Sequence, residues 1–264
     1  MIRNKSLLLS LILLTYPISG WSAEKFDWST VLTIPSGTNQ TTGNQILHFK
    51  SINKPYEQDE QAKSFVEKYL SEAIPLTSDA EVLKYGSDSV RLKGLFIELG
   101  VCTGKTINFI AALNPHQKIY GFDSFEGLPE DWVREDKIIT AGTFGFKNPD
   151  LLPPVLHNVE LVKGWFDDTL SKFIKTLAVE EKIAFLHIDS DIYSSTATAL
   201  KVLGSKICQG TIIVFDELYN YPGYENHEFK ALQEFLSQSG YEVRYLAYNI
   251  YHEQIAVQII EKPE

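Results

Sequence analysis

Five short apolar runs, most of them separated by helix-like stretches, constrain the fold of this 264-residue chain more than any other feature. Each run is rich in β-branched and aromatic residues, and the stretches 103–113, 167–178 and 194–206 have helical patterning. Strands that alternate with helices form a parallel sheet whose faces are covered by the helices. The five runs are GLFIELG (94–100), KIYGFDS (118–124), VELVKGW (159–165), IAFLHIDS (183–190) and GTIIVFDE (210–217).

The residues on either side of these runs predict the outer parts of the fold. Apolar side chains recur at helical spacing after residue 57, which predicts an amphipathic helix that stops before Pro75. A second helix, EFKALQEFLSQS, ends at Gly240 and precedes two strand-like runs, YEVRYLAYN and QIAVQII, which predict an antiparallel C-terminal hairpin. We therefore expect an α/β, Rossmann-like fold with a seven-stranded, mostly parallel sheet and helices on both faces.

The expected domain spans 57–264 and follows an irregular lead-in, 24–56, that is polar and has no clear periodicity. Before it, Arg3 and Lys5 precede an apolar stretch without charges, which is the order typical of a secretory signal. Residues 1–23 thus predict a signal-like or anchor segment, with export or membrane tethering as its role. A buried N-terminal helix and an overextended start site are the alternatives.

Composition narrows the class of partner. Hydrophobic residues make up 44% of the chain, which is enough for one sizeable core. The net charge of −10 and the lack of a Lys/Arg cluster argue against a nucleic-acid-binding protein, because gripping phosphates requires a basic face. We expect a small-molecule partner and no nucleic acid. Contact with a membrane is expected only through an uncleaved N-terminal segment, and a homo-oligomer is left open.

Each of the five apolar runs ends in acidic, glycine or other residues of types that often line binding sites. In open α/β sheets, ligands bind outside the carboxyl ends of the strands. One acid at a strand end is often a helix cap, but five strand ends that all carry acids, glycines or an aromatic residue predict one site. These residues are Glu98, Gly100, Asp123, Ser124, Gly164, Trp165, Asp189, Asp191, Asp216 and Glu217.

The turn ELGVCTGKT (98–106) resembles a phosphate-binding loop but fails its spacing. A phosphate loop needs four residues between its first glycine and the Gly-Lys pair, and only three lie between Gly100 and Gly104. The dinucleotide pattern fails as well, because Cys102 and Lys105 replace its second and third glycines. What remains is a tight strand-to-helix turn, followed by Asp123 at about the sequence separation expected of a ribose-binding acid. This combination suits S-adenosylmethionine, a nucleoside that bears an amino acid and no phosphate.

At these residues the sequence resembles class I S-adenosylmethionine-dependent methyltransferases, and in particular the macrocin O-methyltransferase (TylF/MycF-like) family. The resemblance covers roughly residues 92–260 and implies a methyltransferase version of the Rossmann-like fold. The segments that carry it are FIELGVCTGKTINFIA, YGFDSFEGLPEDW, LVKGWFDDTL, FLHIDSDIYSST and GTIIVFDE.

The resemblance implies roles for individual positions. Glu98, Gly100 and Gly104 would shape the methionine pocket, and Asp123 would bind the ribose hydroxyls. The adenosine would be flanked by Ser124, Phe125, Gly164 and Trp165.

The resemblance also implies a divalent metal, usually magnesium, at Asp189, Asp191, Asp216 and Glu217. Magnesium requires nearly octahedral oxygen ligands at about 2.0–2.1 Å and keeps several positions for water or substrate, so carboxylates from two adjacent strand ends suffice. Direct coordination by Glu217 is open, because the family often has an aspartate there. The alternative is that Asp191 merely caps the next helix. His187 is expected to be a core histidine.

The expected reaction is transfer of a methyl group to a hydroxyl of a small molecule, with a sugar among the candidates. A metal would lower the pKa of that hydroxyl, and Asp191, or secondly His227, would take the proton. The alternative is a catalytically idle exported binding module on a methyltransferase scaffold, suggested by residues 1–23. Localisation is therefore open, since supply of the methyl donor favours the cytoplasm. A third hypothesis, a nucleoside triphosphatase, rests on the Gly-Lys-Thr sequence at 104–106 and fails on the loop spacing.

Overall fold

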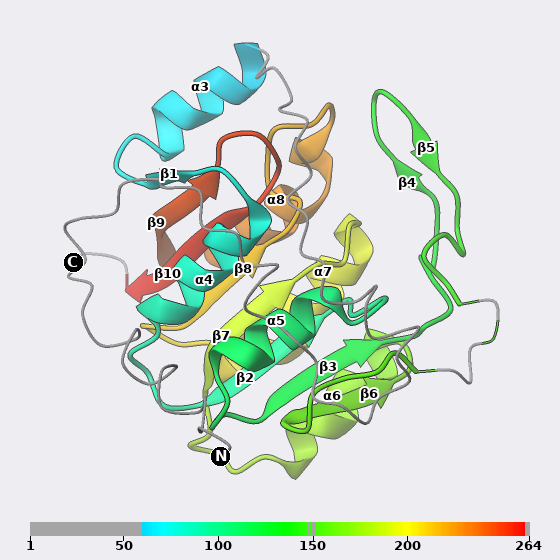
Figure 1. Ribbon diagram of the computed structural model, residues 1–264. Helices are drawn as coiled ribbons and strands as arrows, with labels where there is room; N and C mark the ends of the chain where they lie inside the picture. The colour runs from blue at the N-terminus through cyan, green and yellow to red at the C-terminus, as the bar shows by residue number, and fades with distance from the viewer. Residues whose placement is uncertain (1–59, 147, 149–151, 262–264) are drawn as a thin grey trace, which may run out of the picture.

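The protein is described by a computed structural model over residues 60–146, 148 and 152–261. Eight strands form a central sheet in the order β1-β9-β10-β8-β7-β2-β3-β6 (Figure 1). β10 is antiparallel to both β8 and β9, and the other pairings within this sheet are parallel. The strands are β1 Ile74–Leu76, β2 Leu95–Leu99, β3 Ile119–Asp123, β6 Val159–Lys163, β7 Ile183–Ile188, β8 Ile212–Phe215, β9 Tyr241–Asn249 and β10 Ile255–Glu261.

Helices cover both faces of this sheet, and each face has its own apolar cluster. One cluster joins α4 and α5 to side chains such as Phe96, Phe185 and Val214. The other joins α6, α7 and α8 to neighbours of those residues along the strands, such as Leu186 and Ile213. The side chains alternate between the faces because successive residues of a strand point to opposite sides. The helices are α3 Glu60–Tyr69, α4 Asp79–Ser89, α5 Lys105–Leu113, α6 Phe166–Thr176, α7 Tyr193–Leu203 and α8 Glu228–Ser239, with short 3₁₀ turns at η3 Gly204–Lys206 and η4 Tyr224–Asn226.

The predicted fold class is confirmed, with additions at two places. The seven expected strands are present, including the antiparallel hairpin β9–β10, and β1 adds an eighth strand at the edge beside β9. A separate two-stranded hairpin, β4 Trp132–Val133 and β5 Ile138–Ile139, projects from the carboxyl edge of the sheet at the upper right of Figure 1. The helix α4 was not among the expected elements.

Parallel topology brings the carboxyl ends of β2, β3, β6, β7 and β8 to one edge, which is where the site residues were predicted. Within the described range, no helix is both long and apolar enough to cross a membrane. The signal-like segment 1–23 and the lead-in 24–56 lie outside the described residues.

Candidate functional site

A cavity of about 580 Å³ opens at the carboxyl edge of the sheet. Its volume lies within the range of small-molecule sites. Eight of the predicted site residues line it, from five different strand ends: Gly100, Asp123, Ser124, Gly164, Trp165, Asp189, Asp191 and Glu217. The topology has therefore brought together side chains that are up to 117 positions apart in the sequence.

The glycine turn between β2 and α5 approaches the end of β7 very closely. Gly100 has a φ of +86°, and a Cβ atom at this position would lie 1.6 Å from the carbonyl oxygen of Asp189. Only glycine combines that backbone conformation with that approach. The turn is thus held against the strand that carries two of the site's carboxylates.

Asp123 ends β3 and braces the same turn. Its Oδ2 accepts hydrogen bonds from the backbone N–H groups of Val101 at 2.8 Å and Cys102 at 2.7 Å. Its Oδ1 accepts one from the N–H of Phe125 at 2.6 Å. The carboxylate lines the cavity while it fixes the turn, so one side chain shapes the region where the donor is expected to bind.

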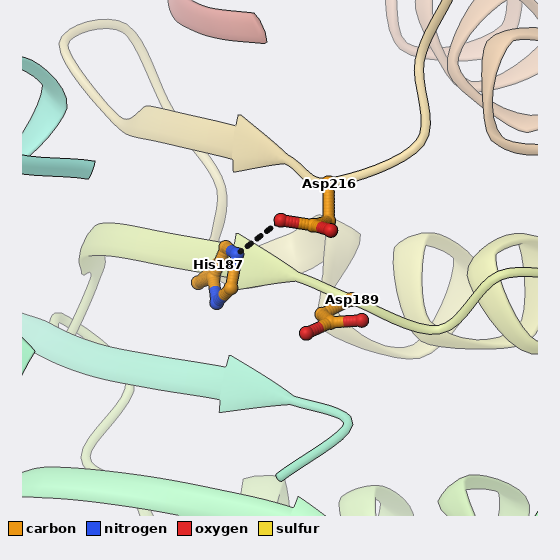
Figure 2. Close-up of side chains that lie close together, drawn as sticks. All are labelled: His187, Asp189 and Asp216. Atoms are coloured by element: carbon orange, nitrogen blue, oxygen red, sulfur yellow. Dashed lines mark ion pairs between the residues drawn. The ribbon is translucent and has the colours of Figure 1, made fainter. Parts of the chain in front are cut away.

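Two overlapping groups of potential metal ligands lie beside this turn. Asp189, Asp191 and Glu217 each offer an oxygen, and these atoms lie within 4.8 Å of one another. His187, Asp189 and Asp216 form the second group, so Asp189 belongs to both (Figure 2). In Figure 2, the carboxylate of Asp216 points toward the His187 ring, from which it is separated by 3.8 Å between Oδ1 and Nε2.

Burial and mutual repulsion perturb the acids of these groups. Burial, with repulsion from Asp216 next, holds the pKa values of Asp189 and Glu217 well above their ordinary range. The same two causes raise the pKa of Asp191 to about 7. Burial works in the same direction on Asp216, but the neighbouring His187 outweighs it and lowers the pKa of that carboxyl. The ionised forms of these carboxyls therefore repel one another, and a cation bound among them would offset that repulsion.

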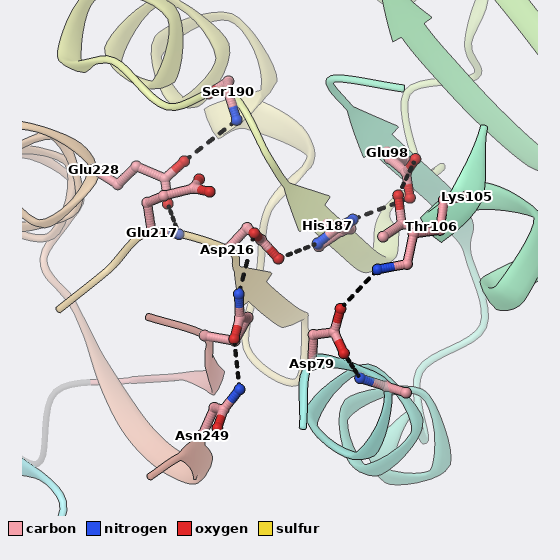
Figure 3. A network of polar contacts seen from close by, with 12 residues as sticks. Asp79, Glu98, Lys105, Thr106, His187, Ser190, Asp216, Glu217, Glu228 and Asn249 are labelled. Carbon is pink, nitrogen blue, oxygen red and sulfur yellow. Dashed lines mark hydrogen bonds and ion pairs between the residues drawn. The ribbon is translucent and has the colours of Figure 1, made fainter. Parts of the chain in front are cut away.

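His187 is a buried histidine, as expected, but it also connects the two halves of the site. Its Nδ1 lies 3.0 Å from Glu98 Oε2, and Glu98 Oε1 accepts a hydrogen bond from Thr106 on α5 (Figure 3). Burial lowers the pKa of the imidazole, but the carboxylates of Asp216 and Glu98 outweigh burial and hold that pKa well above its usual value. Through His187, the glycine turn and the end of β8 are parts of one polar network.

Five predicted site residues do not line the cavity. Glu98 is fully buried, and Gly104 is the N-cap residue that precedes α5, with a φ of +81°. Phe125 packs in the core against Phe146, and Asp216 faces His187 and Gln254. None of these four residues is among those that line the cavity.

His227, the second candidate base, is also outside the cavity. Its Nε2 lies 2.9 Å from the carbonyl oxygen of Val133, so the ring is engaged with the β4–β5 hairpin. Its ring also packs edge-on against Trp132, which belongs to the same hairpin. Of the two candidate bases, Asp191 is the one that faces the cavity.

Sequence reasoning missed several wall residues. Gly127, Leu128 and Pro129 line the cavity, and all three belong to the segment YGFDSFEGLPEDW that carries the family resemblance. Ser194 and Ser195 follow Asp191 in a second such segment, FLHIDSDIYSST. The family resemblance could therefore have identified these five residues as cavity-lining. Cys102, Phe166, Asp167 and Ser190 also lie in segments that carry the resemblance. Phe144 and Thr198 lie outside these segments, and no pattern in the sequence marked them.

The residues present fit a divalent cation. Among the described residues, the buried Glu217 Oε2 has no hydrogen-bond partner, which is costly unless something else satisfies it. The all-oxygen group Asp189, Asp191 and Glu217 matches the preference of magnesium. Glu217 is therefore one of the residues that could hold such a cation, and its direct coordination stays a prediction.

Known proteins resemble this chain in sequence and in fold. A curated relative, the 8-demethyl-8-(2,3-dimethoxy-alpha-L-rhamnosyl)-tetracenomycin-C 4'-O-methyltransferase of Streptomyces olivaceus, is 26% identical over 156 residues. The match takes in 51% of this chain and 58% of that relative's length. The crystal structure of CalS11, a calicheamicin methyltransferase, is similar in fold, with a TM-score of 0.52 and 20% identity over 90% of this chain and 99% of that one.

The sequence profile of the family described as Macrocin-O-methyltransferase (TylF) matches residues 87–241, which is more than half of the chain. The matched range contains the glycine turn, Asp123 and both acidic strand ends, and all of these come together at the cavity. The chain belongs to the macrocin O-methyltransferase family.

Proposed function

We propose that this protein is an S-adenosylmethionine-dependent O-methyltransferase that acts on a hydroxyl of a small molecule, a sugar or sugar-linked compound, with the help of a divalent cation. The observation that carries the proposal is the shared cavity: the braced glycine turn and the carboxylate group Asp189, Asp191 and Glu217 line the same space. A donor held at the turn and a hydroxyl held at the carboxylates would therefore lie next to each other.

The two ends of the cavity suit the two substrates. Asp123, Gly164 and Trp165 lie on the side of β3 and β6, where the adenosine of the donor would bind. Trp165 is 39% exposed and offers an aromatic face. The sugar acceptor is supported by the curated relative, whose name describes methylation of a rhamnosyl group.

The chain's own residues account for alignment and proton removal. In the transfer, the acceptor oxygen forms a bond to the methyl carbon, the carbon–sulfur bond breaks, and its electron pair stays on sulfur. Asp191 faces the cavity and is our assignment for the group that takes the hydroxyl proton. A cation bound by the carboxylate group would supply Lewis acidity that lowers the pKa of the hydroxyl. The rest of the rate would come from the orientation of the two substrates within the cavity.

A labelled-methyl assay tests this proposal. Purified protein is incubated with methyl-labelled S-adenosylmethionine and a panel of rhamnosylated natural products, free sugars and phenols. We expect label in a sugar-containing product, loss of transfer with excess chelator, and recovery when Mg²⁺ is added. Transfer that continues in excess chelator would refute the cation's role. Failure to bind the donor at all in calorimetry would refute the enzyme and favour the idle binding module, which the comparisons do not support.

A further inference from the structure

Glu228 is a buried carboxylate that the proposed reaction does not use. It is the first residue of α8 and its side chain is fully buried. Glu228 Oε1 accepts a hydrogen bond from the backbone N–H of Ser190 at 3.4 Å, and Oε2 accepts one from the N–H of Glu217 at 3.1 Å (Figure 3). One side chain from a helix thus reaches the ends of two different strands.

Those two bonds lie where the sheet itself no longer connects the strands. The last residue pair of β7 and β8 is Ile188 and Phe215, and the N–H of Asp216 still bonds to the carbonyl of Ile188 at 2.9 Å. Beyond this point β7 continues into Asp189 and Ser190, and β8 into Asp216 and Glu217. Glu228 joins the strands two residues beyond this last pair, immediately after each of the two aspartates.

A carboxylate is an expensive group to place there. A buried charge beside other acids is unfavourable, and a neutral glutamine would fill the same volume. However, a glutamine amide has only one oxygen, so its NH₂ group would face one of the two backbone N–H donors. A carboxylate instead offers a separate oxygen to each strand end, as Glu228 does here. The two oxygens are also occupied by these bonds, and within the described residues Glu228 belongs to neither group of potential metal ligands.

We propose that Glu228 is a positioning residue: it spans the ends of β7 and β8, fixes the separation of Asp189 and Glu217, and so sets the affinity of the carboxylate group for a divalent cation without contacting the cation. The proposal rests on the cation role in the proposed function. It assigns to α8 a task that neither the family comparison nor the sequence indicated. Outer partners that orient ligands in this way typically change metal affinity by about 10- to 100-fold when they are removed.

The test uses Mn²⁺ as the probe, because its free concentration is measured directly by electron paramagnetic resonance. Glu228→Gln should bind Mn²⁺ about 10- to 100-fold more weakly than the unchanged protein. Its affinity for S-adenosylhomocysteine, measured by calorimetry without metal, should stay within about threefold, since the glycine turn and Asp123 are untouched. The rise in melting temperature caused by Mn²⁺ should shrink in parallel.

The matched control is Glu234→Gln, on the same helix, where the carboxylate accepts a hydrogen bond from Tyr193 away from the strand ends. It should bind Mn²⁺ as the unchanged protein does. Equal Mn²⁺ affinity in Glu228→Gln and the unchanged protein, with only a lower melting temperature, would show a purely structural role and overturn the proposal.

Two further outcomes are decisive. If Glu228→Gln does not fold, Glu228→Asp replaces it. The aspartate side chain is one methylene shorter and cannot reach both amides, so this variant should also bind Mn²⁺ more weakly. Unchanged Mn²⁺ binding would refute the positioning role. An unchanged protein without any Mn²⁺ site would refute the cation role itself and this proposal with it. Tight binding by all variants would refute the role of Glu228 alone.

Discussion

Asp189 is the carboxylate shared by both potential ligand groups, so it is the residue on which the cation hypothesis depends most. Replacing it with asparagine removes one charge and one strong oxygen ligand from whichever group holds the ion. We expect Asp189→Asn to lose Mn²⁺ binding and methyl transfer by at least about 100-fold, while affinity for S-adenosylhomocysteine changes by less than about fivefold. Resonance titration and calorimetry measure the two affinities separately.

Asp167→Asn is the control for this experiment. Asp167 lines the same cavity but lies in the first turn of α6 and belongs to neither ligand group within the described residues. Its replacement should leave Mn²⁺ affinity unchanged. If both substitutions weaken Mn²⁺ equally, the ion responds to the general charge of the cavity and has no defined ligands.

Asp123 supports a second prediction at this scale, because its carboxylate both lines the cavity and braces the turn. Asp123→Ala should weaken binding of S-adenosylhomocysteine by about 10- to 100-fold, from the loss of charge-assisted hydrogen bonds worth about 1.5–3 kcal/mol. Asp123→Asn retains one oxygen for the amides of Val101 and Cys102 and should lose less. Calorimetry on folded variants measures both, and unchanged affinity in Asp123→Ala would remove this residue from the donor site.

The turn between β2 and α5 gives a prediction at the scale of an element. Gly100→Ala places a methyl group 1.6 Å from the carbonyl oxygen of Asp189, at a φ of +86°. We expect its free energy of unfolding to fall by at least about 3 kcal/mol, since strain and overlap both act and the neighbouring atom is backbone. Urea denaturation followed by fluorescence measures the change.

Gly210→Ala separates strain from overlap. Gly210 also has a positive φ, +93°, but of the described residues, its two chain neighbours aside, none lies within 4 Å of an added Cβ atom. It should therefore lose only about 1 kcal/mol, the cost of the left-handed conformation. Similar losses in both variants would show that the close contact of the turn with β7 contributes nothing.

The elements that the sequence predicted are those with a long repeating pattern. The central strands and the helices from α5 to α8 carry clear apolar periods, so their types and order were correct. β1 has only three residues and includes a proline, and β4 and β5 have two residues each, which is too short for a period to be visible. α4 contains a glycine and few apolar residues at regular spacing, so its helical pattern is weak.

The site was predictable to the extent that it follows from strand direction. Parallel strands deliver their carboxyl ends to one edge, which places Asp123, Asp189 and Glu217 around one cavity. The direction of each side chain beyond the strand depends on loop conformation. Phe125 adopts a φ of +57° and points into the core, and Asp216 turns toward His187. Single-sequence patterns carry no information on such angles.

At the scale of the whole molecule, Glu253, in the turn between β9 and β10, makes the free energy of unfolding depend on pH. Burial, with repulsion from Asp216, raises the pKa of Glu253 to about 7 despite the nearby Arg134 guanidinium. A carboxyl whose pKa is higher in the folded state stabilises the fold at low pH, and this contribution is lost as the pH rises from about 4.5 to about 7.

Glu253→Gln removes the ionisable group and therefore this pH-dependent contribution to stability. Without divalent cations, the free energy of unfolding of the unchanged protein should fall more between pH 5 and pH 8 than that of the variant, by up to about 3 kcal/mol. Urea titrations at the two pH values provide the measurement. Glu261→Gln, at the exposed end of β10, should follow the unchanged protein. Parallel pH profiles for Glu253→Gln and the unchanged protein would contradict the assignment.

The antiparallel strand β10 also determines when this fold can form. It lies between β8 and β9 in the sheet, although it follows both along the chain. During synthesis, β8 can join the parallel core as soon as it emerges from the ribosome, but its outer edge stays open, and β9 with its neighbour β1 has no place to attach until β10 has been made. Exposed strand edges of this kind favour pairing with other chains. A nascent chain stalled before residue 255 would therefore be expected to need a chaperone, because the outer edge of β8 is covered only once β10 has been made.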